Sequence, residues 1–289
     1  LRPKTLAATL RSLGRQILGK DVRDARRLIE AAWKRYEAQS PAVSAFECAV
    51  LECLTGASQI TLSSWLGGKL KSIESDITLS AWDPALTAQA AQEASREGFR
   101  QFKIKVGGDF IADMARVRAA VLAARPKPRV ILDGNQGMSV RGALRLVEAC
   151  LKENIAVDLL EQPLPKTDFK GMSALTRRCP VPVAADEMVM SPEAAVRVAG
   201  ERAANVINIK LAKSGILRSL EIAAVARAAG LDLMIGCMAE TARGLSPSVH
   251  LALGTGFFRF VDLDSDWLLV PGVKAKDWKR SGPTLSRGR

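Results

Sequence analysis

Histidine is almost absent from this sequence of 289 residues, which contains only His250. A single histidine excludes most Ser-His-Asp and Cys-His nucleophilic sites, and it excludes zinc sites built from several histidines. His250 lies in SPSVHLALG, an apolar stretch that we predict to be helical, and we interpret it as a structural residue rather than a ligand. Acid-base chemistry near neutral pH would therefore fall to carboxylates or lysines.

Paired cysteines and long apolar runs are also missing. The five cysteines, Cys48, Cys53, Cys150, Cys179 and Cys237, are scattered without CxxC spacing, which is typical of buried thiols. No run approaches the ~18 apolar residues that a membrane helix needs, and the N-terminal LRPKTLAATLRSLGRQ has no apolar core of a signal peptide. We therefore expect a cytoplasmic enzyme or binding protein without a membrane partner.

Nearly all of the net charge of +12 comes from the two ends of the chain. Residues 1–40 hold ten Lys or Arg against four Asp or Glu, and residues 271–289 hold six against one. Eight Phe, five Trp and one Tyr are dispersed and form no recognisable nucleic-acid-binding module. We therefore interpret the basic ends as solvated segments or an interface, and we expect no nucleic-acid partner.

The order of apolar patterns predicts an α/β fold. Residues 1–66 look helical, with Asp21 and Ser40 as possible N-caps and Pro41 in a first turn. From about Ile73, eight short apolar segments alternate with helix-period segments: SDITLSA, FKIKV, RVILDGN, AVDLLEQP, VPVAADE, NVINIK, DLMIGC and FRFVDLD. Such alternation favours a closed (β/α)8 barrel. The alternative, an open Rossmann sheet, would need a GxGxxG turn, which neither KVGGDF nor LDGNQG provides.

Ionisable residues recur where these predicted strands end. They are Lys105, Asp133, Glu161, Asp186, Lys210 and Asp262, on the second to sixth and the eighth strand. In a barrel, the carboxyl ends of all strands meet on one face, so we expect these side chains to form a ring. Three carboxylates from neighbouring strands would offer hard oxygen ligands, which suit Mg²⁺.

The strand QFKIKV adds a pair of lysines to this ring. Because side chains alternate along a strand, Lys103 and Lys105 should both point into the barrel, where one ammonium can lower the pKa of the other. Lys210 should reach the same mouth from the opposite side. Two lysine bases flanking a Mg²⁺-bound carboxylate substrate could remove and return an α-proton through an enediolate. This arrangement predicts a racemase or epimerase.

The same motifs resemble those of the enolase superfamily. FKIKVGG is similar to its KxK strand, ILDGNQG to its DxN, LLEQPLP to its EQP, VAADE to its DE, and INIKLAKSGI to its strand-six lysine. The resemblance implies Asp133, Glu161 and Asp186 as ligands of one Mg²⁺ per subunit, Lys105 and Lys210 as the acid/base pair, Lys103 as the lysine that tunes them, and Asn135 as a partner of the metal ligands.

The seventh and eighth predicted strands indicate which branch of the superfamily this sequence resembles. DLMIGCMAET carries no histidine, which argues against the mandelate racemase branch and leaves the muconate lactonizing subgroup. FVDLDSD resembles the DxD motif with which dipeptide epimerases hold a substrate ammonium, and it implies this role for Asp262 and Asp264. A solvated strand end is the alternative interpretation of the two aspartates. An epimerase of the L-Ala-D/L-Glu type, a homo-oligomer acting on a small carboxylate such as a dipeptide, is the expected function.

Other functions remain open at this point. A cycloisomerase, an o-succinylbenzoate synthase-like dehydratase or an N-acylamino acid racemase would use the same metal and lysines, and a catalytically silent barrel could serve a binding role.

The resemblance implies a partial, mainly helical capping domain over residues 1–70, a barrel over 71–264 and a segment over 265–289 that returns to the capping domain. Where the family usually has KxGG, this sequence has Lys213, Ser214, Gly215 and Ile216.

Overall fold

Eight parallel strands form the centre of the molecule. The computed structural model describes residues 2–269 and 275–288. The strands follow one another around the sheet in chain order: β2 (Ile77–Leu79), β3 (Gln101–Lys105), β4 (Arg129–Asp133), β5 (Val157–Glu161), β6 (Val183–Ala185), β7 (Val206–Ile209), β8 (Asp232–Gly236) and β9 (Phe260–Asp262). At the seam, the Asp76 amide donates to the Val261 carbonyl at 2.9 Å, which links the edge strands β2 and β9. The predicted barrel architecture is confirmed.

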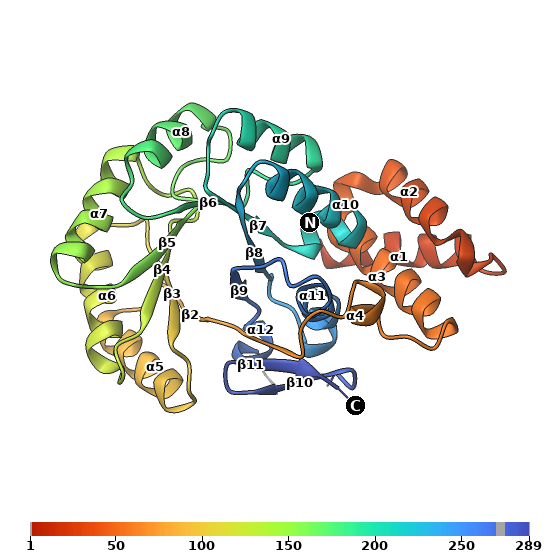
Figure 1. Ribbon diagram of the computed structural model, residues 1–289, viewed down its shortest axis with the longest axis horizontal. Helices are drawn as coiled ribbons and strands as arrows, with labels where there is room; N and C mark the ends of the chain where they lie inside the picture. Colours follow the sequence, from red (N-terminus) through yellow and green to blue (C-terminus); the bar gives the residue numbers. More distant parts are fainter. Residues whose placement is uncertain (1, 270–274, 289) are drawn as a thin grey trace.

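Helices cover the outside of the barrel (Figure 1). They are α5 (Pro84–Arg96), α6 (Phe110–Ala123), α7 (Val140–Lys152), α8 (Phe169–Arg178), α9 (Pro192–Gly200), α10 (Leu211–Ala228) and α11 (Ala242–Thr255), followed by the short α12 (Ser265–Leu268). Six of them begin after a side chain that accepts a backbone N–H as an N-cap: Asp83, Asp109, Ser139, Asp168, Ser191 and Thr241. Helix α10 is interrupted at Gly215, whose backbone conformation is not helical.

Alternation along β3 separates apolar from charged side chains as predicted. Phe102 and Ile104 are fully buried in the large cluster between the strands and the helices, while Lys103 and Lys105 line a cavity at the barrel mouth. Inside the barrel, a smaller apolar layer closes the interior and consists of Ile131, Leu159, Ala184, Val206, Met234 and Phe260. The ionisable side chains at the strand ends therefore lie on a layer of buried apolar side chains.

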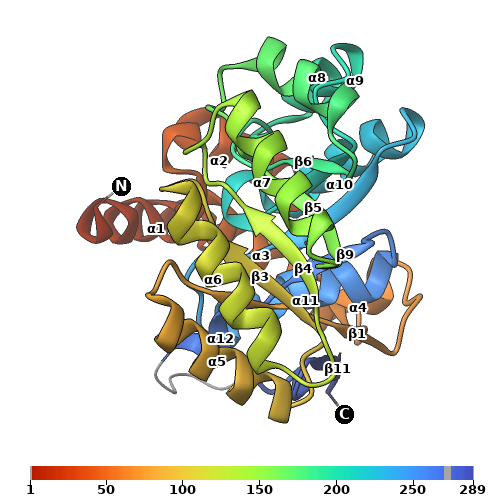
Figure 2. The same cartoon turned by 90° about the vertical axis from the view of Figure 1, so that its left-hand side faces the viewer.

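The N-terminal part is helical and packs beside the barrel, with α3 against α10 (Figure 1). It comprises α1 (Pro3–Ile17), α2 (Ala25–Tyr36), α3 (Ser40–Ala57), α4 (Leu62–Trp65) and the 3₁₀ turns η1 (Val22–Asp24) and η2 (Glu37–Gln39). Figure 2 shows α1 extending away from the rest of the molecule. Two predicted caps differ in detail: Asp21 caps η1 rather than α2, and Ser40 is the first residue of α3 rather than its N-cap.

The C-terminal residues form a second, small sheet. Strands β10 (Trp278–Ser281) and β11 (Thr284–Arg287) pair antiparallel, and β11 pairs with β1 (Ser72–Glu74). Trp278 and Leu285 are buried in the same apolar cluster as Phe46 of α3. Residues 270–274 and 289 of the predicted returning segment lie outside the described residues. Among the helices of the two described ranges, none combines the length and apolar character needed to cross a membrane.

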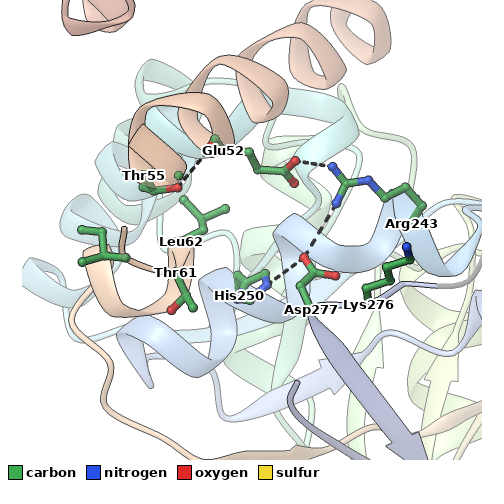
Figure 3. A pocket seen from close by; sticks show the side chains of 10 residues that line it. Glu52, Thr55, Thr61, Leu62, Arg243, His250, Lys276 and Asp277 are labelled. Atoms are coloured by element: carbon green, nitrogen blue, oxygen red, sulfur yellow. Dashed lines mark hydrogen bonds and ion pairs between the residues drawn. The ribbon is translucent and has the colours of Figure 1, made fainter. Parts of the chain in front are cut away.

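A polar network anchors the C-terminal segment (Figure 3). Asp277 Oδ2 lies 3.0 Å from His250 Nε2, and it also accepts a hydrogen bond from Ser246 Oγ. Arg243 pairs with Glu52 of α3 and lies 3.7 Å from Asp277. His250 is only 2% exposed, and this contact agrees with its interpretation as a structural residue.

Asp277 makes the stability of the fold depend on pH. Hydrogen bonds from His250 and then Ser246 outweigh partial burial and hold the pKa of Asp277 well below its usual range. Because the folded-state pKa is depressed, the stabilisation is present above the unfolded pKa of about 3.9 and is lost as pH falls through the folded value. We expect Asp277→Asn to lower the melting temperature at pH 7, and we expect this difference to shrink steadily below about pH 4. A constant difference from pH 7 to pH 2, measured by circular dichroism melts, would contradict this role.

Candidate active site

The ionisable side chains from the strand ends meet around one cavity of about 540 Å³. Seven of the nine predicted site residues line it: Lys103, Lys105, Asn135, Asp186, Lys210, Asp262 and Asp264. The other two, Asp133 and Glu161, are fully buried and contact the lysines that line the cavity. The strand register accounts for this convergence, because Lys105 is paired with Asp133 across β3 and β4, and Asp133 with Glu161 across β4 and β5.

Lys103 is at the centre of the buried charges. Its Nζ lies 2.7 Å from Asp262 Oδ2, 2.8 Å from Glu161 Oε2 and 3.1 Å from Asp133 Oδ2. Lys105 Nζ donates to the same Asp133 oxygen at 2.6 Å. Burial alone would lower the pKa of Lys103, but the carboxylates of Asp133, Asp262 and Glu161 raise it well above its ordinary value. The neighbouring lysine therefore does not lower the pKa of Lys103.

Asp186 sits between two lysines on the other side of the cavity. Lys210 Nζ donates to Asp186 Oδ2 at 2.6 Å, and Lys213 Nζ donates to Oδ1 at 2.7 Å. Burial opposes ionisation, yet Lys213 and Lys210 hold the pKa of Asp186 far below its usual range. Burial likewise opposes protonation of Lys210, but Asp186 raises its pKa.

Three buried polar residues at the site were not identified from the sequence. Lys213 also donates to the carbonyls of Asp186 at 2.7 Å and Asn208 at 2.8 Å, which ties the start of α10 to β7. Asn208 Nδ2 donates to Glu161 Oε1 at 2.8 Å. Asp76, which precedes β2, is buried, and within residues 2–269 and 275–288 neither of its carboxyl oxygens has a hydrogen-bond partner. Lys213 is the lysine of the segment that was compared with KxGG and could have been found, but nothing in the pattern marked Asn208 or Asp76.

Glu161 has less positive charge around it than its neighbours. Its Oε2 accepts no hydrogen bond from the described residues, although the Lys103 ammonium lies nearby. Burial and then the charge of Asp133 raise the pKa of Glu161 to about 7. Buried carboxylates grouped together with no imidazole among them are a donor set that suits a hard divalent cation such as Mg²⁺. The residues present therefore fit the metal.

Asn135 contacts the carboxylates through its backbone. It has a positive φ of 38°, and its amide donates to Asp133 Oδ1 at 3.1 Å. Its side chain is exposed and lines the cavity. The predicted contact with the metal-ligating residues is thus made by the peptide group and not by the side-chain amide.

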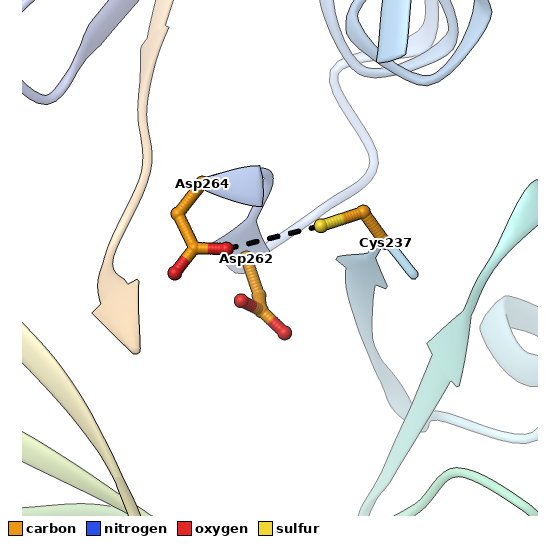
Figure 4. A group of neighbouring side chains, drawn as sticks. All are labelled: Cys237, Asp262 and Asp264. Atoms are coloured by element: carbon orange, nitrogen blue, oxygen red, sulfur yellow. Dashed lines mark hydrogen bonds between the residues drawn. The ribbon is translucent and has the colours of Figure 1, made fainter. Parts of the chain in front are cut away.

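Asp262 and Asp264 lie together with Cys237 at the ends of β9 and β8 (Figure 4). One ligand atom from each of the three residues lies within 4.8 Å of the others. Asp264 has left the strand conformation, with φ −102° and ψ −5°, and its Oδ2 accepts the Thr78 amide at 2.6 Å. Burial and then Asp262 raise the pKa of Asp264 to about 6. These two carboxyls therefore form an acidic, buried end of the cavity rather than a solvated strand end.

Comparison with known proteins agrees with this geometry. The family model described as enolase C-terminal domain-like matches residues 85–288. An aromatic dipeptide epimerase from Herpetosiphon aurantiacus is 38% identical over 96% of this chain and 78% of its own length. The chain belongs to the enolase C-terminal domain-like family. This confirms the family resemblance predicted from the strand-end motifs.

Two further members of the family show how close the similarity is. An L-Ala-D/L-Glu epimerase from Thermotoga maritima is 34% identical over 98% of this chain and 82% of its own length. The crystal structure of a dipeptide epimerase from Enterococcus faecalis, in complex with Mg and L-Leu-L-Tyr, is 29% identical, superposes with a TM-score of 0.89, and covers 100% of this chain and 82% of its own.

We expect Lys103 to contribute more to the free energy of unfolding of this protein than a surface ion pair does. Lys103→Met removes the ammonium that faces three buried carboxylates, and we expect a loss of about 3–5 kcal/mol in the free energy of unfolding. The matched change Arg118→Met breaks the exposed pair between Arg118 of α6 and Glu153 at the end of α7, and it should cost less than about 1 kcal/mol. Urea unfolding of both variants measures the difference. Equal losses would show that the three carboxylates do not depend on Lys103.

Proposed function

We propose that this protein is a Mg²⁺-dependent epimerase that inverts an α-carbon of a dipeptide. The single observation that carries the proposal is the placement of two lysines from opposite sides of the barrel, Lys105 on β3 and Lys210 after β7, around a cavity floored by carboxylates. The similarity to proteins named dipeptide epimerases supports the same reaction. A cytoplasmic location and a homo-oligomeric state remain predictions.

Asp133, Glu161 and Asp186 would hold the ion. When bound, Mg²⁺ would supply positive charge beside the substrate carboxylate and so make the adjacent α-proton more acidic. These three residues come from consecutive strands and are nearly inaccessible to water, so their oxygens are held in place before substrate arrives. The crystal structure of the Enterococcus faecalis epimerase in complex with Mg supports this choice of metal.

Lys105 and Lys210 would exchange the proton. One lysine removes the α-proton from its face, and the other, already protonated, returns a proton to the opposite face, so that the configuration is inverted. Each ammonium is anchored to a carboxylate, Lys105 to Asp133 at 2.6 Å and Lys210 to Asp186 at 2.6 Å. These contacts restrict where each Nζ can lie and would keep the two proton carriers on separate sides of the substrate.

Asp262 and Asp264 would bind the free ammonium of the dipeptide. They lie on β9 and directly after it, across the barrel from β5, so a dipeptide could span the cavity with its carboxylate at one end and its ammonium at the other. Burial and then the charge of Asp262 raise the pKa of Asp264, and a bound ammonium group would favour its ionised form. This feature favours dipeptides over N-acylated or non-amino substrates of related enzymes.

A dipeptide library tests the reaction directly. Incubation with protein and Mg²⁺ in D₂O should add one deuterium, a gain of about 1 Da, to each molecule that is epimerised. Chelation of the metal with EDTA should abolish the exchange, and added Mg²⁺ should restore it. If no member of the library gains deuterium in the presence of Mg²⁺, the protein is not a dipeptide epimerase.

Substitution of each lysine should show which face of the substrate it serves. Lys105→Ala and Lys210→Ala should each abolish epimerisation, because each removes one of the two proton carriers. Each variant should still exchange the α-proton of one epimer, and the two variants should exchange opposite epimers. Chiral chromatography with mass spectrometry measures both quantities. Equal exchange of both epimers in a single-lysine variant would rule out the two-base arrangement.

Asp264 should discriminate between substrates. Asp264→Asn keeps an oxygen that can accept the Thr78 amide but loses the negative charge. We expect kcat/KM for a free dipeptide to fall at least about tenfold, as for loss of a charged hydrogen bond, while an N-acetylated dipeptide is little affected. The ratio of the two kcat/KM values is the measurement. A similar loss with both substrates would mean that Asp264 only supports the structure.

A further inference from the structure

Glu47 connects the helical N-terminal part to the barrel. It lies on α3, it is fully buried, and both carboxylate oxygens are used. Oε1 accepts the backbone N–H groups of Ile216 at 2.8 Å and Leu217 at 2.7 Å, while Oε2 accepts Trp33 Nε1–H at 2.6 Å. A carboxylate buried at this depth is tolerated because three donors replace its water.

The two amides that Glu47 binds lie directly after the break in α10. Gly215 has φ 66° and ψ −169°, a conformation that is essentially restricted to glycine. The helix restarts after this residue, so the first N–H groups of its second section have no partner within the helix. Glu47 supplies that partner from another segment of the chain, in the manner of an N-cap. A Cβ atom at Gly215 would lie 2.1 Å from Glu47 Oε2, so the glycine also makes room for the carboxylate.

The other end of the break carries the lysines of the site. Lys210 immediately precedes α10, and the Lys213 amide donates to the Lys210 carbonyl at 2.9 Å. Lys213 Nζ in turn binds Asp186 and the Asn208 carbonyl. The turn from Leu211 to Ser214 is thus held by β7 on one side and, through Gly215, by Glu47 on the other.

We propose that Glu47 is a positioning residue for Lys210, which it orients by fixing the broken start of α10 against the N-terminal helices. The proposal rests on the proposed function, in which Lys210 serves one face of the substrate. Lys105 is on β3, and among the described residues it makes no hydrogen bond or ion pair with α10. Loss of Glu47 should therefore impair proton transfer on one face and spare the other.

The experiment compares α-proton exchange of the two epimers in D₂O with Mg²⁺. Lys210→Ala and Lys105→Ala first show which epimer each lysine serves. Glu47→Ala should slow exchange of the Lys210-dependent epimer by about 10–100-fold, as small displacements of a catalytic group do, and should leave the other epimer within about twofold. Glu47→Gln keeps an acceptor oxygen and should show a smaller loss on the same epimer.

A matched control separates this role from general support of α10. Glu37→Gln removes another carboxylate that joins the N-terminal part to α10, through Arg218 at 2.9 Å, but Glu37 is exposed. It should leave both exchange rates unchanged. If Glu47→Ala slows both epimers equally, Glu47 only stabilises the fold and the proposal is wrong. If that variant does not fold, Glu47→Gln decides: a loss confined to the Lys210-dependent epimer supports the proposal, and equal or absent losses overturn it.

A crystal structure of the Glu47 variant provides a readout that does not depend on activity. In this structure of the variant, we expect Lys210 Nζ to have moved away from Asp186 Oδ2, which lies 2.6 Å from it in the unsubstituted protein. Lys103 should keep its contact with Asp262. Unchanged positions of both lysines would overturn the proposal whatever the exchange rates are. A wild-type protein that exchanges neither epimer of any dipeptide would instead refute the proposed function, and this structure would still report whether Glu47 places Lys210.

Discussion

A buried ammonium, Lys103, holds together carboxylates from three other strands, and the arrangement of the site depends on this contact. Asp133, Glu161 and Asp262 come from β4, β5 and β9 and would repel one another in a dry interior. Removing each charge from water costs several kcal/mol, and only the geometry of oppositely charged neighbours offsets this cost. The register of the strands supplies that geometry, so the position of each site residue is a consequence of the barrel itself.

The balance of charge is uneven along the cavity. Asp186 is held by two lysines and keeps a strongly depressed pKa, whereas burial and then a neighbouring carboxylate raise the pKa values of Glu161 and Asp264. Glu161 lies among the metal-ligating candidates and Asp264 lies beside Asp262. The protein therefore presents two places where a cation would be favoured, which is the pattern of charge that a metal-bound carboxylate and an ammonium group require.

Periodicity and strand-end chemistry predicted the fold and brought most of the site residues together, because strand order in a barrel follows chain order. The same reasoning failed for the ionisation of Lys103, since it considered the neighbouring lysine on the same strand and not the carboxylates that arrive from β4, β5 and β9. Asn208 and Asp76 could not be found either. Asn208 lies within an apolar strand pattern and Asp76 precedes one, and their significance appears only when neighbouring strands are paired.

The contact between Glu47 and α10 explains a departure from the family pattern. Where the family usually has two consecutive glycines after the strand-six lysine, this chain has Gly215 followed by Ile216. Only Gly215 adopts a backbone conformation that excludes side chains, while Ile216 has its amide bound by Glu47 and its side chain fully buried. A side chain at 216 thus adds apolar contact without disturbing the break in the helix. Gly215 is the glycine of the pair that this chain retains. Both the turn after Lys210 and the Glu47 carboxylate require a glycine at this position.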